Sequence, residues 1–300
     1  MIEIINNKIV LNDIEPLLSN NPISAIFNSL REIWNADFID LKENYKNGEE
    51  LSKNFETMIY STFSEIYDMI IFHAQGKGII QETLLKNKFC LVIMDGMSMR
   101  EVPLLLSELS HLDIEYNYSY SGIPSTTEAF TKKYFDANSP STIKDCVNYK
   151  FHHLMREDRI SEISIDDDKL LIWSVQPDKS FTHFTSKFEI QDLASVSEIT
   201  SRITKKLIEH LENHDEIIIT SDHGYFIDLY SWEGIKDFPS SDRYSNEIPK
   251  FLKKYCKLVN DTYVIIGRYN TIKKGKYVHT RHGGLSFLET IIPYLRIKTR

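Results

Sequence analysis

Cysteine, glycine and proline are scarce in this sequence, and no long apolar run is present. Among 300 residues there are only 3 cysteines, 11 glycines and 9 prolines. The cysteines stand far apart with no CxxC spacing, which excludes a disulfide scaffold and a thiolate zinc finger and favours a reducing cytoplasm. Because no apolar run approaches the ~20 residues that span a bilayer, we expect neither a transmembrane helix nor a membrane partner. The first residues lack the basic and apolar segments of a signal peptide, so we expect none.

The charge of the chain is acidic overall and uneven along its length. The formal net charge is −8, which argues against a protein that coats duplex nucleic acid. Residues 262–300 nevertheless contain eight lysines and arginines against the single acidic residue Glu289. Two interpretations stay open for this segment: a solvated basic surface, or local steering of an anionic substrate.

Residues 1–86 have the pattern of amphipathic helices. Apolar residues recur at three-four spacing over 23–34 and again over 55–70, which predicts two helices that face a core. The polar segment 42–54 between them is interpreted as a connection. No residue of this part has the character of a functional site, so packing is its expected role.

From residue 87 onward the pattern changes to alternating strands and helices. The apolar run 88–95 is typical of a strand buried on both faces, and 113–121, 169–175, 216–222 and 262–268 are further strand candidates. Helices are predicted over 196–211 and after Ser286, which forms a capping box with Glu289. Residues 225–260 interrupt the alternation and are interpreted as a possible insertion or lid. The sequence therefore predicts an α/β catalytic domain over 87–300 with a helical region before it.

Acidic and imidazole residues follow the ends of several predicted strands. Asp95 ends the first strand and precedes Gly96, Asp178 follows the strand 169–175, and Asp222-His223 ends the strand 216–222. In open α/β sheets ligands gather at the carboxyl ends of the strands, so these side chains can converge. An aspartate that caps the following helix is the competing interpretation, and it is strongest for Asp95 taken alone.

Other candidate site residues lie in turns. His282 precedes Gly283-Gly284, His183 follows Asp178 by five residues in a predicted loop, and Thr127 lies in the first turn of a helix that Ser125 could cap. A simple N-cap run and two surface histidines are the competing interpretations. Taken together, oxygen and imidazole ligands without thiolates suit Zn²⁺, Mn²⁺ or a similar divalent ion, and coordination activates a threonine hydroxyl.

The order Asp95, Pro124-x-x-Thr127, Asp178 with His183, Asp222-His223-Gly224 and His282-Gly283-Gly284 resembles the alkaline phosphatase superfamily, and specifically the PglZ domain. The ending HGGLS-x-x-E-x-x-x-P at 282–293 is the most diagnostic part, and the resemblance covers about residues 86–295. It implies a three-layer α/β/α sandwich with two divalent ions, usually zinc. One ion would bind Asp95, Thr127, Asp222 and His223, and the other Asp178, His183 and His282. Thr127, three residues after Pro124, would be the nucleophile, with His279 and Arg281 as possible substrate contacts.

The ligand set and the basic segment 262–300 favour, as the leading hypothesis, a metal-dependent phosphodiesterase or nuclease that acts on nucleotides or oligonucleotides. The cysteine pattern favours the cytoplasm. PglZ proteins occur in bacterial phage-defence systems of the BREX type, so defence proteins are the implied partners. Two alternatives stay open: a phosphomonoesterase of the same superfamily, and a catalytically silent scaffold subunit of a defence complex. The sequence lacks the Cys/Ser-x-Pro-Ser-Arg pattern of sulfatases.

Overall fold

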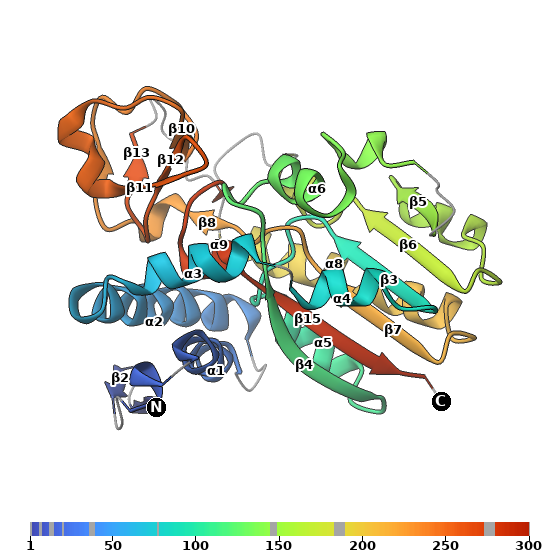
Figure 1. Ribbon diagram of the computed structural model, residues 1–300. Helices are drawn as coiled ribbons and strands as arrows, with labels where there is room; N and C mark the ends of the chain where they lie inside the picture. The colour runs from blue at the N-terminus through green and yellow to red at the C-terminus, as the bar shows by residue number, and fades with distance from the viewer. Residues whose placement is uncertain are drawn as a thin grey trace.

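A six-stranded sheet forms the centre of the computed structural model (Figure 1), which describes residues 2–5, 8–11, 15–19, 21–35, 40–76, 78–144, 149–182, 190–272 and 280–299. The strands lie in the order β4 (Asp113–Tyr120), β15 (Ile291–Lys298), β7 (Glu216–Thr220), β3 (Phe89–Met94), β6 (Lys169–Ser174) and β5 (Lys150–Leu154). Four of these strands were predicted. The edge strand β5 and the strand β15 were not.

The direction of β15 brings the loop before it to the edge of the sheet that the other loops share. β3 pairs in parallel with β6 and β7, and β5 pairs in parallel with β6. β15 is antiparallel to both β4 and β7, with Ile291 opposite Tyr120 and Tyr294 opposite Thr220. The amino end of β15 therefore lies beside the carboxyl ends of its neighbours, where ligands bind in sheets of this kind.

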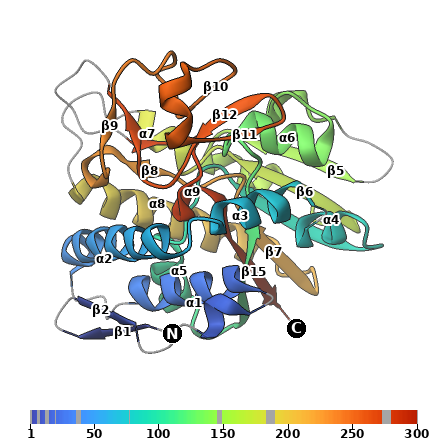
Figure 2. The same ribbon diagram turned by 60° about the vertical axis from the view of Figure 1, so that its left-hand side comes forward.

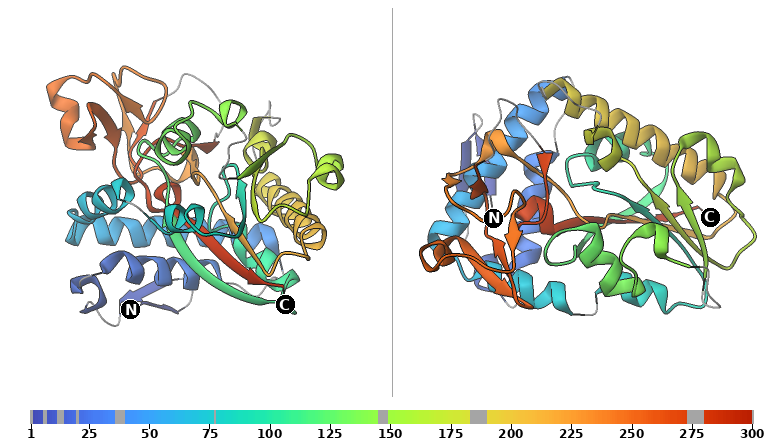
Figure 3. Two further views of the ribbon diagram at one scale, coloured as in Figure 1. Left: turned by 45° about the vertical axis from the view of Figure 1, so that its right-hand side comes forward. Right: turned by 90° about the horizontal axis from the view of Figure 1, so that it is seen from above.

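Helices cover both faces of the sheet, as Figure 3 shows in the view from above. Successive residues of β3 alternate between two cores: Val92 packs with α5 (Val102–Glu108) and α8 (Ile190–His210), whereas Ile93 packs on the opposite face, near α4 (Ile79–Leu84) and α6 (Thr127–Phe135). This alternation is the period of two that a strand buried on both faces imposes. The three-layer α/β/α architecture predicted from the sequence is confirmed.

The N-terminal region is mainly helical, but its helices are not divided as predicted. It contains the hairpin of β1 (Ile2–Ile5) and β2 (Lys8–Leu11), then α1 (Pro22–Trp34), α2 (Leu41–Thr62) and α3 (Ile66–Gln75). The interpretation of 42–54 as a connection is wrong, because this segment forms the first half of α2. Asp40 caps α2 by accepting hydrogen bonds from the amides of Lys42 and Glu43. The predicted helix over 55–70 is two helices that meet near Phe63.

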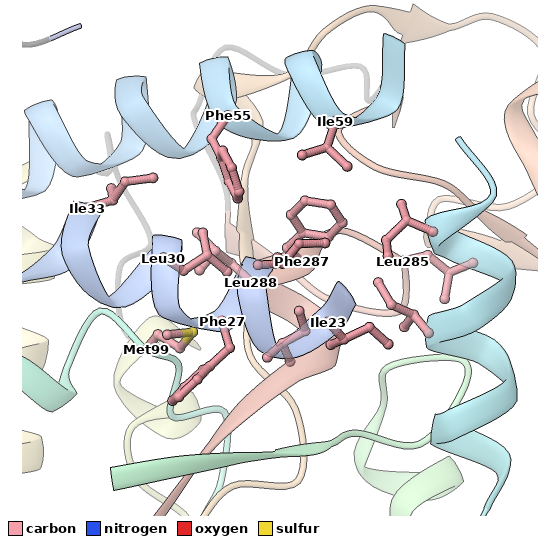
Figure 4. Close-up of a cluster of buried hydrophobic side chains, with 14 of the residues drawn as sticks. Ile23, Phe27, Leu30, Ile33, Phe55, Ile59, Met99, Leu285, Phe287 and Leu288 are labelled. Atoms are coloured by element: carbon pink, nitrogen blue, oxygen red, sulfur yellow. The ribbon is translucent and has the colours of Figure 1, made fainter. Parts of the chain in front are cut away.

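One hydrophobic core joins the N-terminal helices to the C-terminal part of the chain (Figure 4). Phe27 and Leu30 of α1 and Phe55 of α2 are buried in the same cluster as Phe287 and Leu288. The rings of Phe55 and Phe287 lie 6.3 Å apart in an edge-on arrangement. The boundary proposed at residue 86 therefore does not separate two cores, although the division into domains stays a prediction.

Residues 226–272, with β14, form a small β-rich lobe above α2 and α3 (Figure 2). Its strands are β8 (Phe226–Ile227), β9 (Gly234–Ile235), β10 (Tyr244–Ser245), β11 (Cys256–Val259), β12 (Thr262–Ile265), β13 (Asn270–Thr271) and β14 (Thr280–Arg281). The predicted strand 262–268 is shorter than expected and pairs with β10 and β11 rather than with the central sheet. A lid role for 225–260 stays a prediction.

The helix expected after Ser286 ends after one turn. α9 (Phe287–Thr290) has the predicted capping box of Ser286 and Glu289, but the chain continues as β15. Pro293 cannot donate the hydrogen bond that a helix interior requires, and Ile291, Ile292 and Ile297 favour a strand. Single turns also follow β6 and β7, as α7 (Asp178–Thr182) and η4 (Asp228–Tyr230). None of the described helices is both long enough and apolar enough to span a bilayer.

Candidate metal centre

Asp95 and Gly96 follow β3 directly and form the floor of the site. The Asp95 carboxylate accepts a hydrogen bond from the Trp173 indole nitrogen, with Nε1 3.2 Å from Oδ2. Gly96 has φ of +73°, and a Cβ at this position would lie 3.0 Å from the Cβ of Asp178. A glycine is required here because the left-handed backbone and the close approach of Asp178 both exclude a side chain.

Asp222 and His223 follow β7, the neighbouring strand. Both side chains are buried, with Asp222 fully enclosed. Asp222 Oδ1 accepts a hydrogen bond of 3.0 Å from the Gly96 amide, which ties the two strand ends together. His223 Nδ1 lies 2.9 Å from the carbonyl oxygen of Gly224, so Nε2 is the nitrogen that faces the carboxylates. It lies 3.5 Å from Asp222 Oδ2 and 3.7 Å from Asp95 Oδ1.

Thr127 is the first residue of α6, and its hydroxyl points at these side chains. Thr127 Oγ1 donates to Asp222 Oδ2 at 2.7 Å and lies 3.3 Å from His223 Nε2 and 3.5 Å from Asp95 Oδ1. The helix cap is Thr126, whose hydroxyl accepts from the Ala129 amide, and not Ser125 as expected. The structure thus gives the two adjacent threonines different roles, one in the cap and one at the site.

Asp178 and His282 complete the described part of the site. The backbone amide of Asp178 donates to the carbonyl of Asp95 at 2.9 Å, which brings the start of α7 against β3. The ring of His282 stacks on that of His223, with centroids 4.2 Å apart. Gly283, at φ of +100°, makes the turn that presents His282. His282 Nδ1 lies 3.3 Å from the carbonyl oxygen of Ser125.

These side chains form two adjoining groups suited to a metal ion. Ligand atoms of Asp95, Asp222 and His223 lie within 4.8 Å of one another, and so do those of Asp178, His223 and His282. His223 belongs to both groups, whereas the sequence assigned it to one. Six of the seven predicted ligands, Thr127 included, therefore come together from five different segments of the chain. His183 lies outside the described residues.

The electrostatics of the site indicate a place for cations. Burial raises the pKa of the Asp95 carboxyl well above its ordinary value, and the charge of Asp222 adds to the rise. Burial alone would lower the pKa of His223, but the carboxylates of Asp222 and Asp95 raise it. Burial, and then the neighbouring His223, lower the pKa of His282. Two stacked imidazoles so close together do not both take up a proton readily.

The donor set fits divalent ions. Three carboxylates converge here, and the ion pairs within the described part of the chain give them no lysine or arginine partner. Buried carboxylates are normally paired with a cation or coordinate a metal. Oxygen and imidazole donors without thiolate match Zn²⁺ or Mn²⁺.

The two predicted substrate contacts have different outcomes. His279 lies outside the described residues. Arg281 is buried, and its guanidinium donates to Asp228, to the hydroxyl of Thr271 and to the carbonyl of Ser241. These contacts fix β14 within the small lobe. A role for Arg281 in substrate binding stays a prediction that its described contacts do not support.

Two supporting residues were not anticipated from the sequence in their present roles. Trp173 was read only as part of a strand, although an indole N–H at a strand end is a donor that needs a partner. Ser125 links the Thr127 turn to the His282 turn: its hydroxyl donates to the carbonyl of Gly284 at 2.8 Å and accepts from the Gly283 amide at 2.9 Å.

Comparison with protein-family models and with curated proteins found no match for the chain. Among solved structures, murine ectonucleotide pyrophosphatase/phosphodiesterase 5, as an inactive form in complex with AMP, matches at 12% identity over 70% of this chain and 88% of that chain, with a TM-score of 0.47. The human protein of that name matches at 13% identity over 71% and 90%, with a TM-score of 0.46. The C-terminal periplasmic domain of EptC from Escherichia coli, in complex with zinc, matches at 12% identity over 71% and 74%, with a TM-score of 0.37. Similarities at such low identity and TM-score do not define a function for this chain. The geometry of the site is the basis for a proposal.

Proposed function

We propose that this chain is a two-metal phosphodiesterase of the alkaline phosphatase type. The observation that carries the proposal is the Thr127 hydroxyl, 2.7 Å from Asp222 Oδ2 and 3.3 Å from His223 Nε2, among carboxylates that no described lysine or arginine neutralises. A helix cap needs no such surroundings. A nucleophile that must be activated does.

The described residues would hold two divalent ions in the arrangement that the resemblance implies. Asp95, Thr127, Asp222 and His223 would bind one ion. Asp178 and His282 would bind the other, with His183 as its predicted third ligand. Zinc, or alternatively manganese, would lower the pKa of the hydroxyl and neutralise charge on the phosphoryl group.

The reaction proceeds in two displacements at phosphorus. Thr127 Oγ forms the new bond to phosphorus while the bond to one ester oxygen breaks, and that oxygen leaves as an alkoxide, which takes a proton from water. Asp222 Oδ2, which accepts the hydrogen bond of the hydroxyl, is placed to take its proton. Water then attacks the phosphothreonine and Thr127 is released as a free hydroxyl. His223, held by the Gly224 carbonyl, keeps its Nε2 directed at the threonine throughout.

One feature favours a diester over a monoester. A monoester carries more negative charge and calls for an extra cationic clamp, but the buried Arg100, Arg243, Arg268 and Arg281 all pair with carboxylates elsewhere.

The biological setting follows from the resemblance alone. The resemblance of the ending at 282–293 to that of PglZ proteins supports this setting. Such a protein would act on nucleotides or oligonucleotides in the bacterial cytoplasm, within a phage-defence system of the BREX type and with other defence proteins as partners. These assignments support the choice of substrates for testing.

Hydrolysis of bis-p-nitrophenyl phosphate, a generic diester, tests the chemistry. Protein stripped with a chelator and reloaded with Zn²⁺ or Mn²⁺ should turn the diester over, and Thr127→Val should abolish turnover while Thr127→Ser retains part of it. A thymidine p-nitrophenyl phosphodiester and p-nitrophenyl phosphate run beside it compare nucleotide diesters with monoesters.

The outcomes separate the candidate functions. Preference for the monoester would select a phosphomonoesterase. Stoichiometric metal binding without turnover of any ester would overturn the proposal in favour of a silent scaffold subunit. Equal turnover by Thr127→Val and the native protein would remove the threonine from the mechanism.

A further inference from the structure

The buried face of α2 carries a stripe of polar residues. Tyr45, Glu49, Ser52 and Glu56 recur at intervals of four, three and four residues, which places them on one face of the helix. All four are at most 1% exposed. Apolar side chains would be the usual occupants of such a face, so these polar groups need an account of what they contact.

Glu49, in the first half of this stripe, is connected to the loop that carries His223. Glu49 pairs with Nε of Arg100, and both side chains are buried. Arg100 Nη1 donates to the carbonyl of Tyr225 at 2.9 Å, and its guanidinium carbon lies 4.2 Å from the centre of the Tyr225 ring. Tyr225 stands two residues after His223, so Glu49 holds this loop through Arg100.

Glu101 binds the hydroxyl end of Tyr225. The Tyr225 hydroxyl donates to Glu101 Oε1 at 2.6 Å, and the Tyr45 hydroxyl of α2 lies 3.3 Å from the same oxygen. The other carboxylate oxygen of Glu101 accepts from the amide and hydroxyl of Ser98. Both ends of Tyr225 are therefore fixed, at the backbone by Arg100 and at the hydroxyl by Glu101.

Glu56, at the other end of the stripe, contacts the segment after His282. Glu56 Oε1 accepts a hydrogen bond of 2.8 Å from the Phe287 amide at the start of α9, and its Oε2 accepts from Arg268 Nε at 2.9 Å. Figure 4 shows Phe287 lying between α1 and α2 in the core. The same segment is held from its other side, because Glu289 accepts from the Gly284 amide at 3.0 Å.

We infer that Glu49 and Glu56 of α2, through Arg100 and the Phe287 amide, are positioning residues for the two imidazoles of the metal centre. Buried ion pairs rarely stabilise a fold more than apolar residues of the same volume, so stability alone does not explain this stripe. Loss of a group that is hydrogen-bonded directly to a metal ligand weakens metal binding about 10- to 100-fold. Glu49 and Glu56 act one step further out, through Arg100, Tyr225 and Phe287. The N-terminal region would then belong to the catalytic unit.

This inference rests on the proposed function, since it assumes that the imidazoles bind an ion. The test separates positioning from stability by replacing the pair as well as breaking it. Glu49→Gln breaks the pair. The double variant Glu49→Leu with Arg100→Met replaces it with apolar residues of similar volume. Glu50→Gln, on the exposed side of the same helix turn, is the matched control.

The measurements are the thermal midpoint of the ion-free protein, the affinity for Zn²⁺ by competition with a chromophoric chelator, and kcat and KM for the diester. We expect the double variant to keep a midpoint near that of the native protein while binding Zn²⁺ up to about 10-fold more weakly. Its kcat should fall more than its KM rises. Glu50→Gln should match the native protein in all three.

A double variant with native stability and native Zn²⁺ affinity would overturn the inference and leave the proposed function intact. Absence of Zn²⁺ and Mn²⁺ binding by the native protein would instead remove the proposed function, and the inference with it. Should Glu49→Gln alone fail to fold, the double variant still decides between positioning and stability.

Discussion

The metal centre and the cluster around α2 both contain buried carboxylates, but the basic groups near these carboxylates differ. At the metal centre, Asp95, Asp178 and Asp222 converge with imidazoles as their nearest basic groups. Around α2, Glu49 pairs with Arg100 and Glu56 with Arg268. The described residues give the first group no lysine or arginine partner, whereas the second contains its own arginines. Under the proposed function, uncompensated carboxylate charge marks the site, and the proposed positioning residues carry compensated charge.

The cluster around α2 should be the more sensitive to loss of a single charge. Glu49→Gln removes the charge that pairs with Arg100 and, at 3.5 Å, with Arg268, which costs about 3–5 kcal/mol of unfolding free energy because both arginines are buried. Urea unfolding of the ion-free protein measures this loss. The exposed Glu50→Gln should change stability by no more than about 0.5 kcal/mol. Equal effects of the two substitutions would contradict the comparison.

The metal centre should respond to ions to a degree that the α2 cluster does not. Zn²⁺ at a hundred times its dissociation constant should stabilise the protein by about 2.7 kcal/mol, because it binds the folded state alone. Thermal unfolding with and without chelator measures the gain. The gain should shrink in Asp95→Asn and persist in Glu50→Gln. A gain unaffected by Asp95→Asn would place the ion elsewhere.

Neutralising a carboxylate at the metal centre should stabilise the ion-free protein, which is the opposite sign to Glu49→Gln. Asp95→Asn removes a charge that burial and Asp222 disfavour, so we expect a gain in the free energy of unfolding in chelator. The folded-state pKa of Asp95 is raised, so its carboxyl costs most above that pKa. The gain should therefore fade as the pH is lowered toward the unfolded value of about 3.9. A loss of stability at pH 7 would contradict this sign.

Lys133 offers a third, smaller case: a half-buried ammonium whose Nζ donates to the carbonyl of Ala74. Burial lowers its pKa to about 8. The folded protein then loses this proton before the unfolded chain does, so stability attributable to Lys133 rises with pH from about 8 to about 10. Lys133→Met should be more stable than the native protein at pH 7, with the difference shrinking by pH 10. Thermal midpoints across this range measure it, and a constant difference would contradict the shift.

Much of the central fold followed from local patterns. The buried runs of β3, β6 and β7 were recognisable because a strand covered on both faces must be apolar throughout. The polar residues at their ends then indicated the site, since Asp95, Asp222 and His223 follow those strands directly. Thr127 and His282 were candidates from their turns and received their roles from the family resemblance. The structure brings both to the same edge of the sheet.

Two predictions of secondary structure were wrong because the polarity or the periodicity of the segment fits two structures. Residues 42–54 are polar and were read as a connection, yet Glu49 and Ser52 lie on the buried face of α2. Their burial depends on Arg100 and Trp34, which are distant in sequence and could not be paired with them in advance. The apolar residues after Ser286 are compatible with a helix or with a buried strand. They form a strand because β15 pairs with both β4 and β7 in the sheet.

By itself the sequence determined the residue types at the site and the strands that deliver most of them, because these depend on local composition and period. The three-layer architecture was implied by the family resemblance. The tertiary structure decided which residues meet. The antiparallel direction of β15 brings His282 to the other ligands, and His223 belongs to both groups of ligand atoms. Through Glu49 and Glu56, α2 is connected to the segments that follow His223 and His282. Contacts between residues 49 and 100, or 56 and 287, leave no periodic trace along a single chain, since they are set by the packing of elements rather than by the spacing within one.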